Sequence, residues 1–224
     1  SKQFSTVKAS DIESIINTYI NHNRKFNSGE SEEILIDVNG DNIIVSRTGY
    51  TGEDGFEIYA SHEVINNFWD QLLASKRCLP CGLGCRDTLR FEVGLPLYGD
   101  ELSENISPVM AGLSIFCKLD KPEFIGKEAL RQQKEEGVAQ KLVGLELKDK
   151  AIPRHGYNVI ADGKPVGAVT TGYHGISVDK SIAMALVDTE FSKLGTELEI
   201  QIRKKTFPCV VVKKKFYDKH YKKD

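Results

Sequence analysis

The 224-residue sequence lacks any long hydrophobic run, and no basic–apolar–small stretch opens it. Its apolar runs are only a few residues long, which is too short for a helix that crosses a bilayer. A secretory signal would need the missing opening pattern. The five cysteines are an odd number and form no disulfide framework. These absences predict a chain of a reduced, cytosol-like compartment that does not enter membranes.

Several signatures of known chemistry are also missing. There is no G-x-S-x-G elbow of a serine hydrolase and no recognised nucleic-acid-binding module. A glycine-rich stretch is present, but no Gly-Lys-Ser/Thr follows it and no long helix opens after it, which excludes Walker and Rossmann loops. The five histidines are scattered along the chain at His22, His62, His155, His174 and His220. We therefore expect no hydrolase triad and no nucleic-acid partner.

Three cysteines, Cys78, Cys81 and Cys85, lie close together with the spacing C-x2-C-x3-C. A structural zinc site needs four ligands, and no fourth cysteine or histidine follows at a suitable distance. The surrounding pattern is also unlike that of a thioredoxin redox motif. The sequence predicts no metal site here and favours small packing residues.

Charge is unevenly distributed. Residues 203–224 carry nine basic and two acidic groups, a net charge of +7, whereas the other 202 residues carry 21 basic and 30 acidic groups, a net charge of −9. Such a basic segment can attract polyanions or acidic partners. It can equally be a solvated strand edge followed by a frayed terminus. The sequence leaves both interpretations open.

The first part of the chain mixes helices and strands. A capping box at Ser10 to Glu13 predicts a helix over residues 11–22. Asn39-Gly40 between two alternating runs predicts a hairpin, and a short strand is expected over Phe56–Tyr59. Apolar residues at helical spacing predict an amphipathic helix whose stripe consists of Val64, Ile65, Phe68, Trp69, Leu72 and Leu73.

Further helices are expected from about Gly84 to just before Gly94 and over residues 128–136, with a short buried helix or strand within residues 108–117. From Lys141 the pattern changes to short strands separated by turns, with Asp162-Gly163 as a second hairpin turn. The expected strands are Leu142–Leu147, Tyr157–Ala161, Val166–Thr171, Ile182–Val187, Leu198–Ile202 and Phe207–Lys213.

This order of elements predicts an α+β protein. Six short strands at such spacing favour a small antiparallel barrel or sandwich at the C-terminal end. We expect a boundary near residues 137–141, with a first domain over residues 1–137 and a small antiparallel β domain over residues 138–224.

The glycine-rich stretch, R-T-G-Y-T-G-E-D-G-F-E over residues 47–57, allows sharp turns and close approach of a ligand to the backbone. Strand alternation would place Glu57 and Tyr59 on one face and Phe56 and Ile58 on the other. A glutamate there is commonly just solvated. Beside such a turn, its carboxylate could instead accept two N–H groups of a heterocycle.

A second candidate, Arg86, lies in the first turn of a predicted helix within G-L-G-C-R-D, residues 82–87. A cation at that end opposes the helix dipole, whereas the neighbouring Asp87 suits it. A residue that breaks a local rule is a candidate for a functional role. The alternative is a simple ion pair between Arg86 and an acidic residue elsewhere.

These motifs resemble the glycine cleavage system T-protein family, the aminomethyltransferases. The resemblance runs from about residue 43 to 217. It is carried by S-R-T-G-Y-T-G-E-D-G-F-E-I (46–58) and G-L-G-C-R-D-T-L-R-F-E-V-G-L-P-L-Y-G (82–99), in the family's order and at its distance. K-L-D-K-P-E-F-I-G (118–126), I-P-R-H-G (152–156) and V-T-T-G (169–172) continue it.

The resemblance implies a folate-binding α/β region followed by a small antiparallel β-barrel domain. It also implies an enzyme of glycine catabolism that releases ammonia from the aminomethyl-lipoyl arm of the H-protein and passes the one-carbon unit to tetrahydrofolate, its co-substrate. Glu57 would then grip the pterin edge, Arg86 would help bind the folate or a nearby water, and Tyr221 would match a tyrosine that closes on the site. The compartment would be the cytoplasm, or alternatively the mitochondrial matrix.

The sequence departs from the family pattern in one respect. Family members carry a key aspartate in an Asp-Asp segment well upstream of the Arg-Thr-Gly-Tyr motif, and no such segment precedes Arg47 here. Residues 1–42 also fit the family poorly. We therefore expect the C-terminal part of a T-protein that has no catalytic aspartate of its own and is inactive alone. The alternative is a non-catalytic folate-binding module of the same architecture.

Overall fold

The structure is a computed structural model that describes residues 33–218 except for 39–40, 47, 54 and 77. The helix expected over residues 11–22 and the candidate Tyr221 lie outside this range. The chain forms two compact units that divide between Cys85 and Arg86. The expected domain boundary near residues 137–138 remains a prediction.

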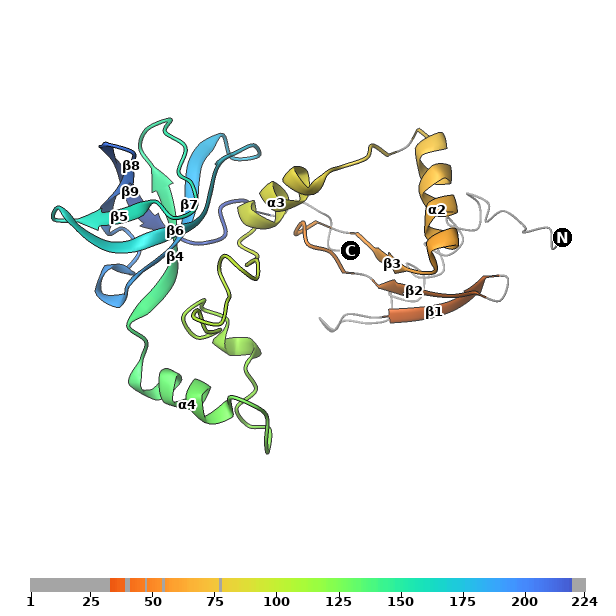
Figure 1. Cartoon of the computed structure of the whole chain (residues 1–224), viewed down its shortest axis with the longest axis horizontal. Helices are drawn as coiled ribbons and strands as arrows, with labels where there is room; N and C mark the ends of the chain where they lie inside the picture. The colour runs from red at the N-terminus through yellow and green to blue at the C-terminus, as the bar shows by residue number, and fades with distance from the viewer. Residues whose placement is uncertain (1–32, 39–40, 47, 54, 77, 219–224) are drawn as a thin grey trace. The chain divides into compact units, whose positions relative to one another are not determined.

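In its described residues, the first unit contains a small antiparallel sheet followed by helix α2 (His62–Ala74) (Figure 1). Strands β1 (Glu33–Val38), β2 (Asp41–Ser46) and β3 (Glu57–Tyr59) lie side by side in that order. Val38 pairs with Asp41, so the two strands are joined across residues 39–40, where the Asn-Gly pair predicted a hairpin. Ser46 pairs with Glu57, and the glycine-rich stretch therefore forms the connection between β2 and β3.

Helix α2 (His62–Ala74) follows β3 directly and confirms the predicted amphipathic helix. Glu63 lies in its first turn, where a carboxylate interacts favourably with the helix dipole. No residue of α2 is fully buried, and the Trp69 side chain of its apolar stripe is 49% exposed.

The division between the two units falls within helix α3 (Leu83–Glu92), which starts and ends near the predicted positions. Turns then lead to helix α4 (Lys127–Glu136). The helix or strand expected within residues 108–117 is reduced to one turn of 3₁₀-helix, η1 (Ser114–Phe116). That expectation of a buried element is wrong, because the Phe116 side chain is 75% exposed and only Ala111 of the segment is buried.

Six antiparallel strands form a closed barrel in the order β4-β7-β6-β5-β8-β9 (Figure 1), which confirms the predicted small barrel. A short 3₁₀ turn, η2 (Thr189–Phe191), follows β7. The strands are β4 (Gln140–Leu147), β5 (Asn158–Ala161), β6 (Lys164–Gly175), β7 (Lys180–Asp188), β8 (Glu197–Ile202) and β9 (Lys205–Val212). Closure occurs where β4 pairs with β9, from Gly144 opposite Val212 to Leu147 opposite Cys209.

Local sequence explains two features of the barrel. Asp162 and Gly163 both have positive φ, 49° and 74°, as the predicted two-residue hairpin turn requires. Gly167 on β6 lies so close to β7 that an added Cβ would come within 2.2 Å of the Leu186 carbonyl oxygen. Any larger residue at position 167 would therefore push these strands apart.

Two apolar clusters stabilise the second unit. The larger fills the barrel and includes Leu145, Val159 and Ile200. The smaller joins α3 to the outside of the barrel and consists of Phe91, Ala111, Leu142, Ile182 and Met184. The second cluster fixes α3 against β7, and it therefore determines where the polar side chains of α3 lie.

Part of the basic segment belongs to the barrel. Strand β9 pairs with β8 from Lys205 to Val210 and with β4 only from Cys209 to Val212. Residues 205–208 therefore have a strand partner on one side only, as a strand edge does, and the barrel closes over residues 209–212. Among the described residues, none of the helices is both long and apolar enough to cross a membrane.

Candidate active site

Glu57 is held at the start of β3 by hydroxyl groups. The Thr48 hydroxyl donates a hydrogen bond to Glu57 Oε2, and the Tyr59 hydroxyl lies 3.3 Å from the same atom. Glu57 and Tyr59 therefore share a face of the strand, as the alternation predicted. Oε1 accepts no hydrogen bond from any described residue, and the carboxylate is half-buried. Among the described residues, the protein thus orients one oxygen of the carboxylate and places no hydrogen-bond donor on the other.

Arg86 lies in the first turn of α3, as expected, and its side chain is exposed. The next residue, Asp87, points toward the barrel. Tyr173 on β6 donates a hydrogen bond to Asp87 Oδ2. Arg90 Nε donates to Asp87 Oδ1 over 2.6 Å. Asp87 thus connects the helix turn that carries Arg86 to a barrel strand.

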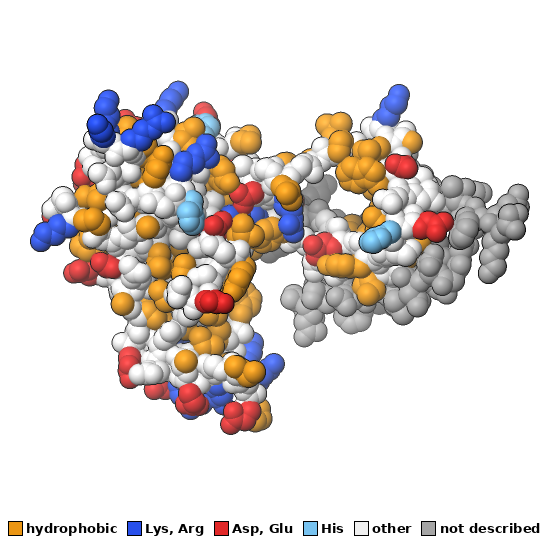
Figure 2. Space-filling model, viewed as in Figure 1, with side chains coloured by type: hydrophobic (Ala, Val, Ile, Leu, Met, Phe, Trp, Pro, Cys, Tyr) orange, Lys and Arg blue, Asp and Glu red, His pale blue; other side chains and the backbone are white. Residues whose placement is uncertain are grey.

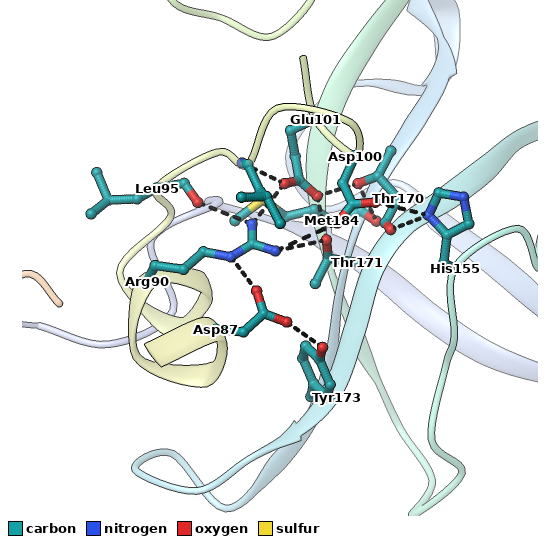
Figure 3. Close-up of polar contacts among 11 residues, drawn as sticks. Asp87, Arg90, Leu95, Asp100, Glu101, His155, Thr170, Thr171, Tyr173 and Met184 are labelled. Carbon is teal, nitrogen blue, oxygen red and sulfur yellow. Dashed lines mark hydrogen bonds and ion pairs between the residues drawn. The ribbon is translucent and has the colours of Figure 1, made fainter. Parts of the chain in front are cut away.

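A buried ion pair lies behind Asp87 (Figure 3). Arg90 Nη1 lies 2.7 Å from Glu101 Oε2, and neither side chain is exposed to solvent. Arg90 also donates to the Leu95 carbonyl oxygen over 3.2 Å and to Thr171 Oγ1 over 3.2 Å. Four hydrogen bonds from one guanidinium therefore tie together α3, the turn that follows it and β6.

Glu101 accepts hydrogen bonds on both carboxylate oxygens. The Thr170 and Thr171 hydroxyls donate to Oε1 over 2.7 and 2.6 Å, and the Leu97 amide donates to Oε2 over 2.9 Å. His155 Nδ1 lies 2.7 Å from the Thr170 carbonyl oxygen at the edge of this group. The Glu101 carboxylate is thus compensated both by hydrogen bonds and by the charge of Arg90. A buried charge requires such compensation.

The charges in this network shift the pKa of their neighbours. Burial alone would lower the pKa of Arg90, but Glu101 and Asp87 outweigh it and raise the pKa above its usual value. The hydrogen bond to Asp87, together with burial, raises the pKa of Tyr173. Burial and the nearby Glu101 raise the pKa of Asp100. Arg90 is therefore permanently charged, which suits a fixed structural group better than a proton donor.

The candidate residues predicted from the sequence fall in different parts of the chain. Glu57 belongs to the first unit and Arg86 to the second, so their shared pocket remains a prediction. Tyr221 lies outside the described residues. The sequence reasoning missed the Arg90 network. Its one available signal was a charged residue between the apolar Leu89 and Phe91, where a helix packs against a core.

The three clustered cysteines do not serve as packing residues. Cys78, Cys81 and Cys85 are all exposed, so that expectation is wrong. They lie on the loop before α3 and in its first turn, where no apolar cluster of the described residues covers them. The neighbouring Cys81, through a hydrogen bond between the two thiols, raises the pKa of Cys85.

Comparison with known proteins gives a consistent result along the chain. Residues 11–121 match a family described as the GCVT N-terminal domain, and residues 140–218 match the glycine cleavage T-protein C-terminal barrel domain. An aminomethyltransferase of Alkaliphilus oremlandii (strain OhILAs) is 52% identical over 189 residues, which cover 83% of this chain and 51% of the relative. An aminomethyltransferase of Clostridium botulinum (strain ATCC 19397 / Type A) is 53% identical with the same coverage.

A solved structure agrees with the sequence relatives. The crystal structure of the glycine cleavage system aminomethyltransferase T from Bartonella henselae is similar, with a TM-score of 0.77 and 31% identity. The similarity covers 81% of this chain and 51% of the other. The chain thus spans about half the length of the curated relatives that it matches.

Proposed function

The chain belongs to the glycine cleavage T-protein family, and on that premise we propose that it provides the folate-binding part of an aminomethyltransferase. Such an enzyme releases ammonia from an aminomethyl group on the lipoyl arm of the H-protein and passes the one-carbon unit to tetrahydrofolate. The observation that carries the proposal is the 52% identity to an aminomethyltransferase over 189 residues, which includes both glycine-rich motifs.

In this proposal Glu57 binds the pterin edge of tetrahydrofolate. A pterin offers adjacent N–H groups that a carboxylate can accept side by side. The geometry supports this role, because the Thr48 and Tyr59 hydroxyls orient Oε2 while Oε1 accepts nothing from the described chain. A carboxylate already fixed by two hydroxyls loses little conformational freedom when a ligand binds.

Arg86 is the second proposed contact, to the folate or to a nearby water. Its exposed position in the first turn of α3 supports this role. Tyr221 is the third proposed contact. We further propose that the folate-binding region extends to residue 137, with the β domain from residue 138, and that the protein acts in the cytoplasm.

The chemistry also needs a carboxylate beside the reacting carbon to orient the attack and stabilise charge. No Asp-Asp segment occurs in the 224 residues, so we assign no catalytic residue within them. We propose that a segment outside these residues supplies the group. Lipoylated H-protein is the proposed protein partner.

Tetrahydrofolate binding tests the proposal most directly. We expect Glu57→Gln to weaken binding at least tenfold, because one acceptor becomes a donor that faces the pterin N–H groups. Glu53→Gln is the matched control, since Glu53 is an exposed glutamate of the connection that leads to Glu57. Titration with tetrahydrofolate, followed by intrinsic fluorescence, measures the affinity of both variants. Circular dichroism verifies that each variant is folded. Equal affinities for the two variants would refute the role of Glu57.

A further inference from the structure

A pocket at one end of the barrel has no part in the function proposed above. Its volume is about 630 Å³, within the range of small-ligand sites. It lies between the loop that joins β4 to β5 and the turn that joins β8 to β9. Four of its lining side chains are cations, namely Arg154, Arg203, Lys204 and Lys205. Within the described chain, no aspartate or glutamate lines it.

The floor of the pocket is apolar and rigid. Tyr157, Ile202 and Phe207 line it with their outer faces, while their inner faces pack against the barrel core. Ile152, which is 42% exposed, completes the lining. Because the core anchors these side chains, the apolar surface exists before any ligand arrives. Two aromatic rings on such a floor can stack with a flat ring.

A turn and a contact with an aromatic ring place the cations around this floor. Figure 2 shows Lys and Arg side chains gathered over this end of the barrel. Ile202 pairs with Lys205, so Arg203 and Lys204 are the two central residues of a tight turn. The Arg154 guanidinium lies 5.6 Å from the centre of the Tyr173 ring, which fixes its direction. The turn thus fixes the backbone positions of Arg203 and Lys204, and the Tyr173 ring contacts the guanidinium of Arg154.

Arg203 breaks a rule of turn chemistry. Its φ is +59°, whereas Lys204 keeps an ordinary negative φ. Glycine is the preferred residue at the first position of such a turn, since a side chain there is strained. A strained residue that persists at a pocket rim points to a function for its side chain. Here the side chain is a bidentate donor suited to phosphate or carboxylate groups.

From these features we propose that the pocket binds a nucleotide-type organic anion, with a flat ring on the Tyr157–Phe207 floor and two or more negative charges on the cationic rim. The charge surplus of the rim provides the attraction, and the apolar floor provides selectivity for a ring. This site includes neither Glu57 nor Arg86. The result of a test for anion binding here therefore does not decide whether the folate proposal is right.

ATP, in the presence of a chelator, is the probe, and adenosine and tripolyphosphate are its two separate parts. We expect isothermal titration at fixed ionic strength to give ATP an affinity at least tenfold higher than either part. Equal binding of tripolyphosphate and ATP would show simple charge attraction and overturn the proposal. So would the absence of ATP binding at millimolar concentration, or tighter binding of an Asp/Glu-rich peptide that carries one phenylalanine.

The turn offers a sharp test by mutation. Arg203→Gly removes a charge and also relieves the strain, so the hairpin keeps its fold and its melting temperature does not fall. We expect ATP affinity to drop about tenfold, the loss of one charge-assisted contact. Lys204→Ser is a second variant with the same expectation.

Lys164→Ala is the matched control, because Lys164 is an exposed lysine at the opposite end of the β5–β8 pair. Its removal should leave ATP affinity unchanged. An equal loss in Lys164→Ala and Arg203→Gly, or no loss in Arg203→Gly and Lys204→Ser, would contradict the proposal.

Discussion

Arg90 and Glu101 form an ion pair of 2.7 Å in which neither side chain is exposed to solvent. The pair lies where α3 meets the barrel, and hydrogen bonds to Thr170, Thr171 and Leu97 complete it. A buried pair of this kind contributes less to net stability than to the choice of one arrangement, but the loss of one partner is costly. The position of α3, and with it that of Arg86, therefore depends on Arg90.

Arg90→Met should lower the free energy of unfolding by about 3–5 kcal/mol, because it leaves the Glu101 carboxylate buried without a cation. Arg131→Met is the matched control: it breaks the exposed Arg131–Glu128 pair and should cost less than about 1 kcal/mol. Urea unfolding followed by circular dichroism measures both changes. A similar small loss in the two variants would mean that the Arg90 charge is not needed in the fold.

Tyr173→Phe should destabilise the second unit by about 1–2 kcal/mol at neutral pH, because Asp87 loses one hydrogen-bond donor. Arg90 still compensates the Asp87 charge, so the loss should be smaller than for Arg90→Met. The same unfolding measurement applies. Because Tyr173→Phe keeps the ring and removes only the hydroxyl, a loss as large as that of Arg90→Met would contradict the view that Arg90 still compensates Asp87.

The raised pKa of Tyr173 also predicts a pH dependence. Above about pH 10 the tyrosine of the unfolded chain loses its proton first, while the folded chain retains it. The folded state then binds more protons, so this contribution to stability is complete below pH 10 and is lost as the pH rises through the folded pKa. Unfolding between pH 8 and 11 should show a steeper decline in the wild type than in Tyr173→Phe. Parallel curves would rule out the linkage.

The cysteines should separate by reactivity. Cys78, Cys81 and Cys85 are exposed, whereas Cys209 is buried and burial raises the pKa of its thiol to about 12. Because the thiolate is the reactive form, the exposed three should react with a chromogenic disulfide reagent at pH 8 and Cys209 should not until the chain unfolds. Peptide mapping assigns the labelled sites. Rapid labelling of Cys209 in the native protein would contradict the closed barrel.

The chain alone should release ammonia from aminomethyl-loaded H-protein about two to four powers of ten more slowly than a whole relative, since a positioned acid–base group contributes about that much. Addition in trans of the N-terminal half of the Alkaliphilus oremlandii relative should restore activity. Full activity without that addition would mean that a carboxylate of this chain performs the missing role.

Local chemistry explains which features could be predicted. The turn at Asp162-Gly163 depends on two residues whose preferences suit positive φ, and the amphipathic α2 follows from spacing alone. The ion pair of Arg90 could not be predicted, because Glu101 reaches it only after the chain turns back at Leu95. The exposure of the three cysteines likewise depends on which parts of the chain pack against each other. The spacing of the cysteines in the sequence does not indicate that packing.

The pairing of β4 with β9 makes the first and last strands of the barrel neighbours. The segment from Gln140 to Val212 therefore begins and ends on the same side of the barrel, with Val212 opposite Gly144 in the first strand, and its six strands are all paired within it. A fold with adjacent ends can be inserted into a loop of another protein, or joined end to end and opened elsewhere, without breaking a strand pair. The barrel is thus suited to circular permutation, with Asp162-Gly163 as a natural place for new termini.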